Sequence, residues 1–316
     1  MIALDDVRRA RAVIGDRLHR TPILPQPALG DLAGVTLALK AELFQRTGSF
    51  KARGVLNKLA GLTPEERARG VIGSSAGNHA LALAFGAALE GIAATVVMPL
   101  SAPSSKVAAA RAYGAEVIQV GATSVEMMRE YERLVPLRGQ TPVHPFADPL
   151  VMAGQGTLAL EILEDLPDLE AILVGIGGGG LIGGVATAIK GLAPHVRVVG
   201  VEPEGAPGMT RALAAGKVVR LSSVDTIADG LAPPFVGELG LAATQRDVDD
   251  VVRVSDAEIR EAMALMLEQA KLMAEPAGAA ALAALLAGRA GVRPGARVVV
   301  VVSGGNIDRA RLKSLL

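Results

Sequence analysis

The chain has no cysteine among its 316 residues. This absence excludes a disulfide framework, a thiolate metal site and a cysteine nucleophile, and it is consistent with a cytoplasmic protein. A surplus of either charge is also lacking, because lysine plus arginine and aspartate plus glutamate both number 32 and no stretch holds five like charges. The sequence therefore indicates no surface for nucleic acid or an anionic membrane, and a small-molecule partner is expected.

Long hydrophobic runs are scarce as well. Residues 1–20 carry Asp5 and Asp6 among their arginines and lack a continuous apolar core, which is not typical of a signal peptide. Their spacing predicts an amphipathic helix with an apolar face of Val7, Ala10, Ile14 and Leu18. The segment Ala171–Ile189 has no charge and nearly the length of a membrane span, but seven of its residues are glycine. A strand, a tight loop and a helix explain this segment better than a membrane helix does.

The order of the elements predicts the fold class. From about residue 70 onward, short apolar runs alternate with alanine-rich helical patterns, which is typical of βαβ units. Strands are expected at residues 70–73, 94–98, 115–120, 171–175, 196–201 and 297–302, and helices at 78–90, 103–113, 124–134, 156–164, 181–191, 256–272 and 277–286. We therefore expect an α/β protein with two open, mostly parallel twisted sheets flanked by helices, and a ligand site in the cleft between them. The expected domains are a large one from residues 1–62 and 148–316, and a small one from residues 63–147.

Four consecutive glycines, Gly177–Gly180, precede Leu181 between a predicted strand and a predicted helix. Without Cβ atoms the backbone N–H groups can converge on one point beside the positive end of the helix dipole, so this loop suits a phosphate. Residues 175–180 also match G-x-G-x-x-G, and Glu202 ends the next strand as the ribose-binding acid of a nicotinamide enzyme does. An NAD-dependent oxidoreductase is thus an alternative, although the pattern is weakly specific in so glycine-rich a stretch.

A second loop before a helix comprises residues 73–79, Gly-Ser-Ser-Ala-Gly-Asn-His. Its Gly-x-Ser75-x-Gly spacing matches the nucleophile elbow of α/β-hydrolases, which would also need an acid and a histidine later in the chain. The candidate histidines after Ser75 are His79, His144 and His195, and none lies in the last third of the chain, where that fold usually places it. The same turn presents Ser75, Asn78 and backbone N–H groups at a helix N-terminus, which suits a carboxylate.

Lys51 lies in a stretch rich in glycine, serine and threonine, directly after Phe50. A lone lysine is usually a solvated surface charge. This one, however, follows an aromatic residue in a loop that can bury its stem and lower the pKa of its amine, as a Schiff-base lysine requires. Residues 303–306, Ser-Gly-Gly-Asn, follow the last strand and are typical of a plain turn, but Ser303 is placed to meet a ligand in the cleft.

Together these stretches resemble the threonine dehydratase and serine racemase family, within the fold-type II, tryptophan-synthase-β-like enzymes that use pyridoxal 5′-phosphate (PLP). The resemblance covers nearly the whole chain in order, through residues 20–22, 42–51, 75–80, 144–146, 153–157, 177–181, 201–203, 228–230, 275–278 and 303–306. Because the sequence ends soon after Ser303, we expect the short form of a threonine dehydratase, without the regulatory domain of the biosynthetic enzymes.

The resemblance implies PLP as the cofactor and Lys51 as the catalytic residue that holds it. It implies that Phe50 packs beside the ring, that Asn78 bonds its phenolic oxygen, that Ser303 faces its pyridine nitrogen and that Glu275 lies near it. The implied phosphate ligands are Gly177, Gly178, Gly179, Gly180 and Leu181. The implied residues for the substrate carboxylate are Ser75, Ala76, Asn78 and His79.

The implied reaction is the conversion of L-threonine to 2-oxobutanoate and ammonia, or of L-serine to pyruvate, by β-elimination. Serine racemase is the alternative within the family, but racemases carry a serine where this chain has Ala76, which favours elimination. Glu202 is a weak candidate for a metal ligand, since residues 205–208 add no carboxylate, and no metal is expected. The resemblance also implies a homodimer or homotetramer.

Overall fold

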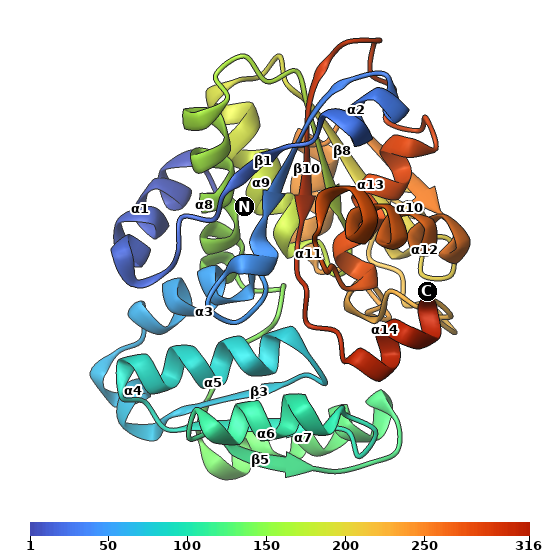
Figure 1. Cartoon of the computed structure of the whole chain (residues 1–316). Helices are drawn as coiled ribbons and strands as arrows, with labels where there is room; N and C mark the ends of the chain where they lie inside the picture. Colours follow the sequence, from blue (N-terminus) through green and yellow to red (C-terminus); the bar gives the residue numbers. More distant parts are fainter.

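The computed structural model describes the backbone of residues 1–316, while the side chains of Ser124 and Val125 lie outside the described residues. Its strands form two sheets (Figure 1). The large sheet has the spatial order β1 (Ile23–Pro25), β2 (Thr36–Ala41), β10 (Arg297–Val302), β7 (Ala171–Gly175), β8 (Arg197–Pro203) and β9 (Asp250–Val254). The small sheet has the order β5 (Glu116–Gln119), β4 (Ala94–Met98), β3 (Val71–Ser74) and β6 (Thr141–Pro142). The pair β1 and β2 is antiparallel and the other described pairs are parallel, which confirms the expected fold class.

Helices flank both sheets (Figure 1). Their bounds are α1 (Leu4–Ile14), α2 (Pro27–Ala33), α3 (Lys51–Ala60), α4 (Pro64–Arg69), α5 (Asn78–Glu90), α6 (Ser104–Ala112), α7 (Ser124–Arg138), α8 (Pro149–Asp165), α9 (Gly180–Leu192), α10 (Gly208–Ala215), α11 (Glu238–Asp247), α12 (Asp256–Leu265), α13 (Pro276–Leu286) and α14 (Arg309–Leu315). Short helical turns lie at Gly15–Arg17, Glu42–Phe44, Asp229–Leu231 and Met266–Ala270.

The large sheet is buried on both faces. Along β10, Val299 and Val301 join the apolar cluster under α8 and α9, whereas Val298, Val300 and Val302 join the cluster under α12 and α13. Successive side chains of a strand point to opposite faces, so a run of five valines fits a strand covered by helices on both sides.

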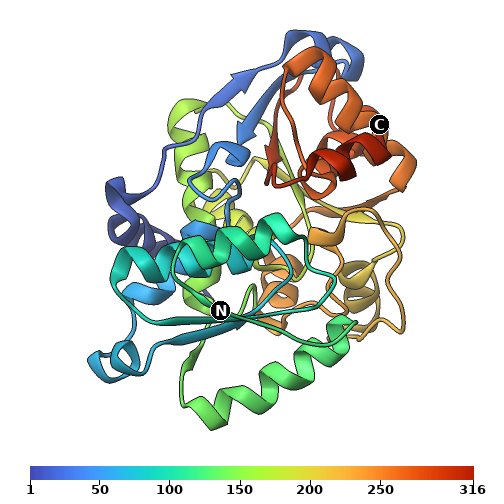
Figure 2. The same cartoon turned by 60° about the horizontal axis from the view of Figure 1, so that its bottom comes forward.

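The small sheet is also covered on both faces, by α5 and α6 on one side and by α7 on the other (Figure 2). The helix α3 packs against α5 of this unit and against α8 of the large one. A Cβ atom on Gly154 of α8 would lie 2.6 Å from Cα of Gly54 in α3, so the two glycines permit a close helix crossing. The helix that begins with Lys51 therefore lies between the two sheets (Figure 1).

Most expected elements are present with similar bounds, and the strands at 94–98, 171–175 and 297–302 have the expected first and last residues. The helix expected at 156–164 begins earlier, at Pro149, because the Asp148 side chain accepts the N–H groups of Leu150 and Val151 and caps it. The helix expected at 256–272 stops being regular after Leu265. The expected face of α1 is buried, but Leu18 lies past the end of this helix, which is a correction.

The apolar segment Ala171–Ile189 contains β7, the glycine loop and most of α9. Among the described residues, no helix combines the length and the apolar character that a membrane crossing needs.

Candidate active site

The loop before Lys51 is hydrogen-bonded to the end of β10. Ser49 forms an isolated antiparallel bridge with Gly304, and Phe50 donates its N–H to the carbonyl oxygen of Ser303 at 3.1 Å. The N–H of Gly305 donates to the carbonyl oxygen of Gly48 at 3.0 Å. These bonds place Lys51 and Ser303 together at the carboxyl edge of a parallel sheet, where ligand sites of this fold class lie.

The amine of Lys51 lies between a backbone carbonyl and an aromatic ring. Nζ donates a hydrogen bond to the carbonyl oxygen of Pro145 at 3.0 Å and lies 5.0 Å from the ring centroid of Phe50. Burial lowers the pKa of Lys51 to about 8, although the carboxyl of Glu275 acts in the opposite direction. A sizeable fraction of this amine is therefore neutral near physiological pH, as a nucleophile or a general base requires.

Asn78 and Glu275 join the turn before α5 to the start of α13. Nδ2 of Asn78 donates to Oε1 of Glu275 at 2.6 Å, while Oδ1 of Asn78 accepts from Nδ2 of Asn306 at 2.8 Å. Burial raises the pKa of Glu275 to about 7, against the opposing charge of Lys106. This network brings Asn78 and Glu275 to the same edge of the cleft as Lys51.

The turn at residues 75–78 has a defined local structure. Oγ of Ser75 accepts the N–H of Gly77 at 3.1 Å, and Ala76 is exposed. The first N–H groups of α5 have no acceptor within their own helix, so they are available to an anion.

The side chain of His79 lies on the other side of this turn and is buried in the small-sheet unit. Its Nε2 donates to the carbonyl oxygen of Val143 at 2.8 Å, and burial lowers the pKa of the imidazole to about 3. The hydroxyl of Ser75 and the ring of His79 thus have separate partners, and the described contacts include no Ser–His pair of the kind that a hydrolase uses.

The tetraglycine loop connects β7 to α9, as expected. Gly179 has a φ of 91°, which favours glycine, and a Cβ atom there would lie 2.9 Å from Cα of Gly240. A Cβ atom on Gly178 would overlap the ring of Phe146. Leu181 is buried in the core below, so the first turn of α9 is fixed while its N–H groups lack acceptors within the helix.

Ser303 is buried, and its hydroxyl lies 3.4 Å from the carbonyl oxygen of Ala277 in the first turn of α13. Ala277 lies two residues after Glu275 in the chain. A neutral hydroxyl at this place holds a proton on a nearby ring nitrogen far less strongly than a carboxylate would.

Glu202 has a structural role in the fold. Its carboxylate accepts the N–H groups of Met209 and Thr210 and, at 2.7 Å, the hydroxyl of Thr210, which caps the start of α10. Both oxygens are therefore engaged. Among the described side chains, no group of three or more His, Cys, Asp or Glu residues is arranged to hold a metal ion.

Residue-by-residue interpretation of the sequence missed a buried ionic cluster behind Lys51. Arg53 donates to Glu42 at 2.8 Å and to Glu161 at 2.6 Å, and Nζ of Lys40 also donates to Glu161 at 2.6 Å. All four side chains are buried. Arg53 belongs to the first turn of α3, so the cluster fixes the helix that begins with Lys51. The feature of the sequence that could have indicated this cluster is the arginine two residues after the candidate lysine.

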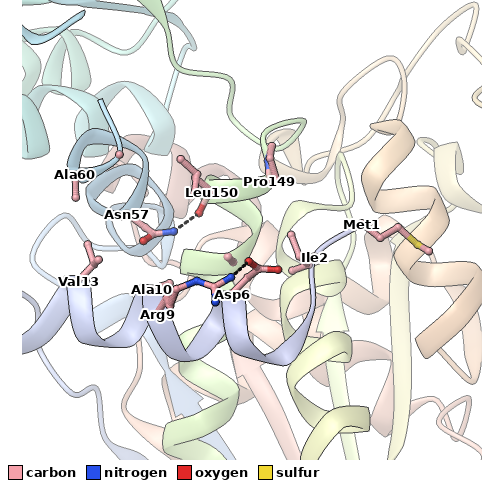
Figure 3. A pocket seen from close by; sticks show the side chains of 12 residues that line it. Met1, Ile2, Asp6, Arg9, Ala10, Val13, Asn57, Ala60, Pro149 and Leu150 are labelled. Carbon is pink, nitrogen blue, oxygen red and sulfur yellow. Dashed lines mark hydrogen bonds and ion pairs between the residues drawn. The ribbon is translucent and has the colours of Figure 1, made fainter. Parts of the chain in front are cut away.

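A separate surface pocket of about 440 Å³ lies between α1, α3 and α8 (Figure 3). Its polar groups satisfy one another, because Arg9 pairs with Asp6 and Nδ2 of Asn57 donates to the carbonyl oxygen of Leu150 (Figure 3). None of the candidate site residues lines this pocket.

Residues 14–304 match the family described as pyridoxal-phosphate dependent enzymes, and the chain belongs to this family. The match covers every candidate site residue from Phe50 to Ser303.

Individual relatives agree with this family. The chain is 46% identical to the L-threonine ammonia-lyase of Thermotoga maritima over 308 residues, which are 98% of this chain and 76% of the relative. The solved structure of maize serine racemase has a TM-score of 0.94 at 38% identity, covering 99% of this chain and 96% of that one. The processed form of threonine deaminase isoform 2 from Solanum lycopersicum has a TM-score of 0.93 at 37% identity, covering 99% and 91% respectively.

Proposed function

We propose that the protein is a PLP-dependent threonine and serine dehydratase, which converts L-threonine to 2-oxobutanoate and ammonia and L-serine to pyruvate and ammonia. The observation that carries this proposal is the partly neutral Lys51 amine, with a pKa of about 8, whose neighbour Phe50 is bonded to Ser303. Nζ of Lys51 donates to Pro145, and the ring of the next residue, Phe146, packs against Gly178 of the glycine loop. Relatives that are named threonine ammonia-lyase and threonine deaminase, and that match nearly all of the chain, support the same reaction.

The residues of the cleft fit PLP. Gly177–Gly180 and Leu181 would hold its phosphate, since the N–H groups at the start of α9 lack helical acceptors and Cβ atoms on Gly178 or Gly179 would meet neighbouring atoms. Lys51 would hold the cofactor covalently through Nζ, with Phe50 packed beside its ring. Further contacts would come from Asn78 and Glu275 at the ring edge and from Ser303 at the pyridine nitrogen.

When bound, PLP supplies an electron sink for the charge that develops at Cα of the substrate. The turn of residues 75–78 receives the substrate carboxylate, through the hydroxyl of Ser75 and the free N–H groups of Ala76, Asn78 and His79. Lys51 takes the Cα proton at its Nζ, because burial keeps this amine partly neutral. The β-hydroxyl then leaves as water, carrying the proton that Lys51 removed from Cα. A second water hydrolyses the remaining imine to ammonia and the 2-oxo acid.

Elimination rather than racemisation follows from the two faces of Cα. Racemisation needs one group that removes the proton and another that returns it from the opposite side. Lys51 serves one face, whereas the position that a serine occupies in racemases is Ala76 here. Oγ of Ser75 accepts the N–H of Gly77, and its hydroxyl proton is directed to the substrate carboxylate. The opposite face therefore lacks a proton donor.

The same proposal extends to the organisation of the enzyme. Residues 63–147, which contain the small sheet, form a small domain, and residues 1–62 with 148–316 form the large one. The absence of cysteine supports a cytoplasmic location, and the family resemblance supports a homodimer or homotetramer.

The test is to incubate the purified protein with PLP and L-threonine and to measure 2-oxobutanoate and ammonia together. The two products are expected in equal amounts, and Lys51→Ala should abolish them. The proposal is wrong if the wild-type protein forms neither product from L-threonine or L-serine. An exposed lysine variant, Lys217→Met, serves as the control and should keep full activity.

A further inference from the structure

Lys106 contributes a cation to the cleft that the chemistry described above does not use. It lies in the first turn of α6, in the small-sheet unit, and is half-buried. A cation at this end of a helix is disfavoured by the helix dipole, which is positive there. Among the described contacts, Nζ of Lys106 has neither a hydrogen bond nor an ion pair that would offset this cost.

The ammonium group is directed toward the turn before α5. The position that a Cβ atom on Gly77 would occupy lies 3.5 Å from Nζ of Lys106. Gly77 precedes Asn78, the first residue of α5, so the cation and the free N–H groups of this helix lie on the same turn. The ammonium of Lys106 and the free N–H groups of α5 thus both create positive potential at this turn. Among the described residues, no anionic side chain contacts the ammonium.

The position of Lys106 is fixed from the large-sheet unit. The neighbouring Ser105 donates its hydroxyl to Oδ1 of Asp308 at 2.6 Å, and Asp308 precedes the first residue of α14. This bond connects the start of α6 to the segment that follows Ser303. The charge of Lys106 also acts across the cleft, since it lowers the pKa of Glu275 against the larger effect of burial.

We infer that Lys106 is a substrate-binding residue that pairs with the α-carboxylate of the amino acid held by the turn of residues 75–78. The inference rests on the proposed function for the identity of the substrate class. Lys106 would then favour a free amino acid over a derivative whose carboxylate is replaced by a neutral group, such as an amide. A charge-assisted bond of this kind is among the stronger contacts that a carboxylate makes in a partly dry site.

The experiment uses the PLP-loaded enzyme and L-alanine, which has no β-hydroxyl to lose and therefore binds without elimination. Binding is followed by the change in the absorption spectrum of the cofactor, for L-alanine and for the neutral L-alaninamide. Lys106→Met should raise the Kd for L-alanine about tenfold or more, as expected for loss of a charged partner, and should leave the Kd for L-alaninamide unchanged. Lys106→Arg, which keeps the charge, should lose less, and Lys217→Met should change neither constant.

Two outcomes would overturn the inference. One is an equal loss for both ligands, or no loss, in Lys106→Met with an unchanged far-UV circular dichroism spectrum. The other is an altered pH profile of kcat with an unchanged KM, which would make Lys106 a counterion of Glu275 only. Failure of the proposed function is distinguishable, because it would appear as no 2-oxo acid from L-threonine while L-alanine binding still discriminates by charge.

Discussion

The amide of Asn78 donates a 2.6 Å hydrogen bond to the carboxyl of Glu275, which lies 197 residues later in the chain. The first residue belongs to the small-sheet unit, and the second directly precedes α13 of the large one. The bond therefore joins the two walls of the cleft directly beside Lys51. Its acceptor is buried, and burial raises the pKa of Glu275 to about 7.

The raised pKa of Glu275 predicts a pH-dependent loss of stability in the protein without PLP. Between pH 4.5 and about 7 the unfolded chain has released this proton while the folded chain retains it, so stability falls as pH rises through this window. Glu275→Gln removes this titration. The free energy of unfolding of the variant, relative to that of the wild type, should therefore be higher at pH 7.5 than at pH 4.5 by an amount on the order of 2 kcal/mol. Urea unfolding of both proteins at the two pH values measures this change. The same stability difference between variant and wild type at both pH values would contradict the raised pKa of Glu275.

The buried cluster around Arg53 predicts a large stability loss when its cation is removed. Arg53→Met leaves the carboxylates of Glu42 and Glu161 buried with fewer partners, which should cost about 3–5 kcal/mol of the free energy of unfolding. The matched control is Arg11→Met, because Arg11 pairs with Glu164 on the surface and should cost below about 1 kcal/mol. Denaturant unfolding measures both variants. Similar decreases in their free energies of unfolding would contradict the larger contribution expected of the buried ion pairs.

The contact of Gly178 with Phe146 predicts a specific effect on the phosphate loop. In Gly178→Ala the new methyl group meets the Phe146 ring, so the loop must shift. Overpacking of this kind costs about 1–3 kcal/mol, which corresponds to roughly a 5- to 150-fold loss of PLP affinity. Equilibrium titration of the cofactor-free protein with PLP checks this.

The control for the glycine loop is Gly208→Ala at the start of α10, where a Cβ atom would lie 3.4 Å or more from its neighbours. This variant should bind PLP like the wild type. Unchanged PLP affinity in Gly178→Ala would place the phosphate elsewhere.

The identity of residue 76 predicts the balance between elimination and racemisation. Ala76→Ser places a hydroxyl on the exposed side of the turn, opposite to Lys51 in the proposed geometry. Production of D-serine from L-serine should then rise about tenfold or more over the wild type, since a placed acid or base accelerates proton transfer substantially. Chiral chromatography of the amino acids, with pyruvate measured alongside, gives the ratio; abundant D-serine from the wild type would contradict the argument.

Local patterns in the sequence predicted the strands β3, β4, β5, β7, β8 and β10 and the loops of the site, but not the strands β1, β2, β6 and β9. The valine run of β10 and the glycines before α9 carry strong signals, because their composition permits few other conformations. The first residue of α8 was harder to predict from the sequence, since Asp148 acts as a cap only through its own side-chain conformation. Helix ends in general depend on such single contacts.

Local sequence patterns could not predict the contacts between residues that are far apart in the chain. The ionic cluster joins Arg53 to Glu161, and the turn at Gly77 meets Lys106, through distances that only the packed fold defines. The burial that shifts the pKa of Lys51 likewise depends on residues from both units. The family resemblance supplied the candidate residues, while the structure supplied their partners.

The most direct test of the central claim is the chemical identity of the lysine that holds PLP. The PLP-loaded protein is reduced with borohydride, digested and mapped by mass spectrometry, with the yellow colour recorded before and after. The account predicts loss of the visible band and a single modified peptide that carries the reduced cofactor on Lys51. A protein that stays colourless with PLP, or that carries the label on another lysine such as Lys58, would contradict it.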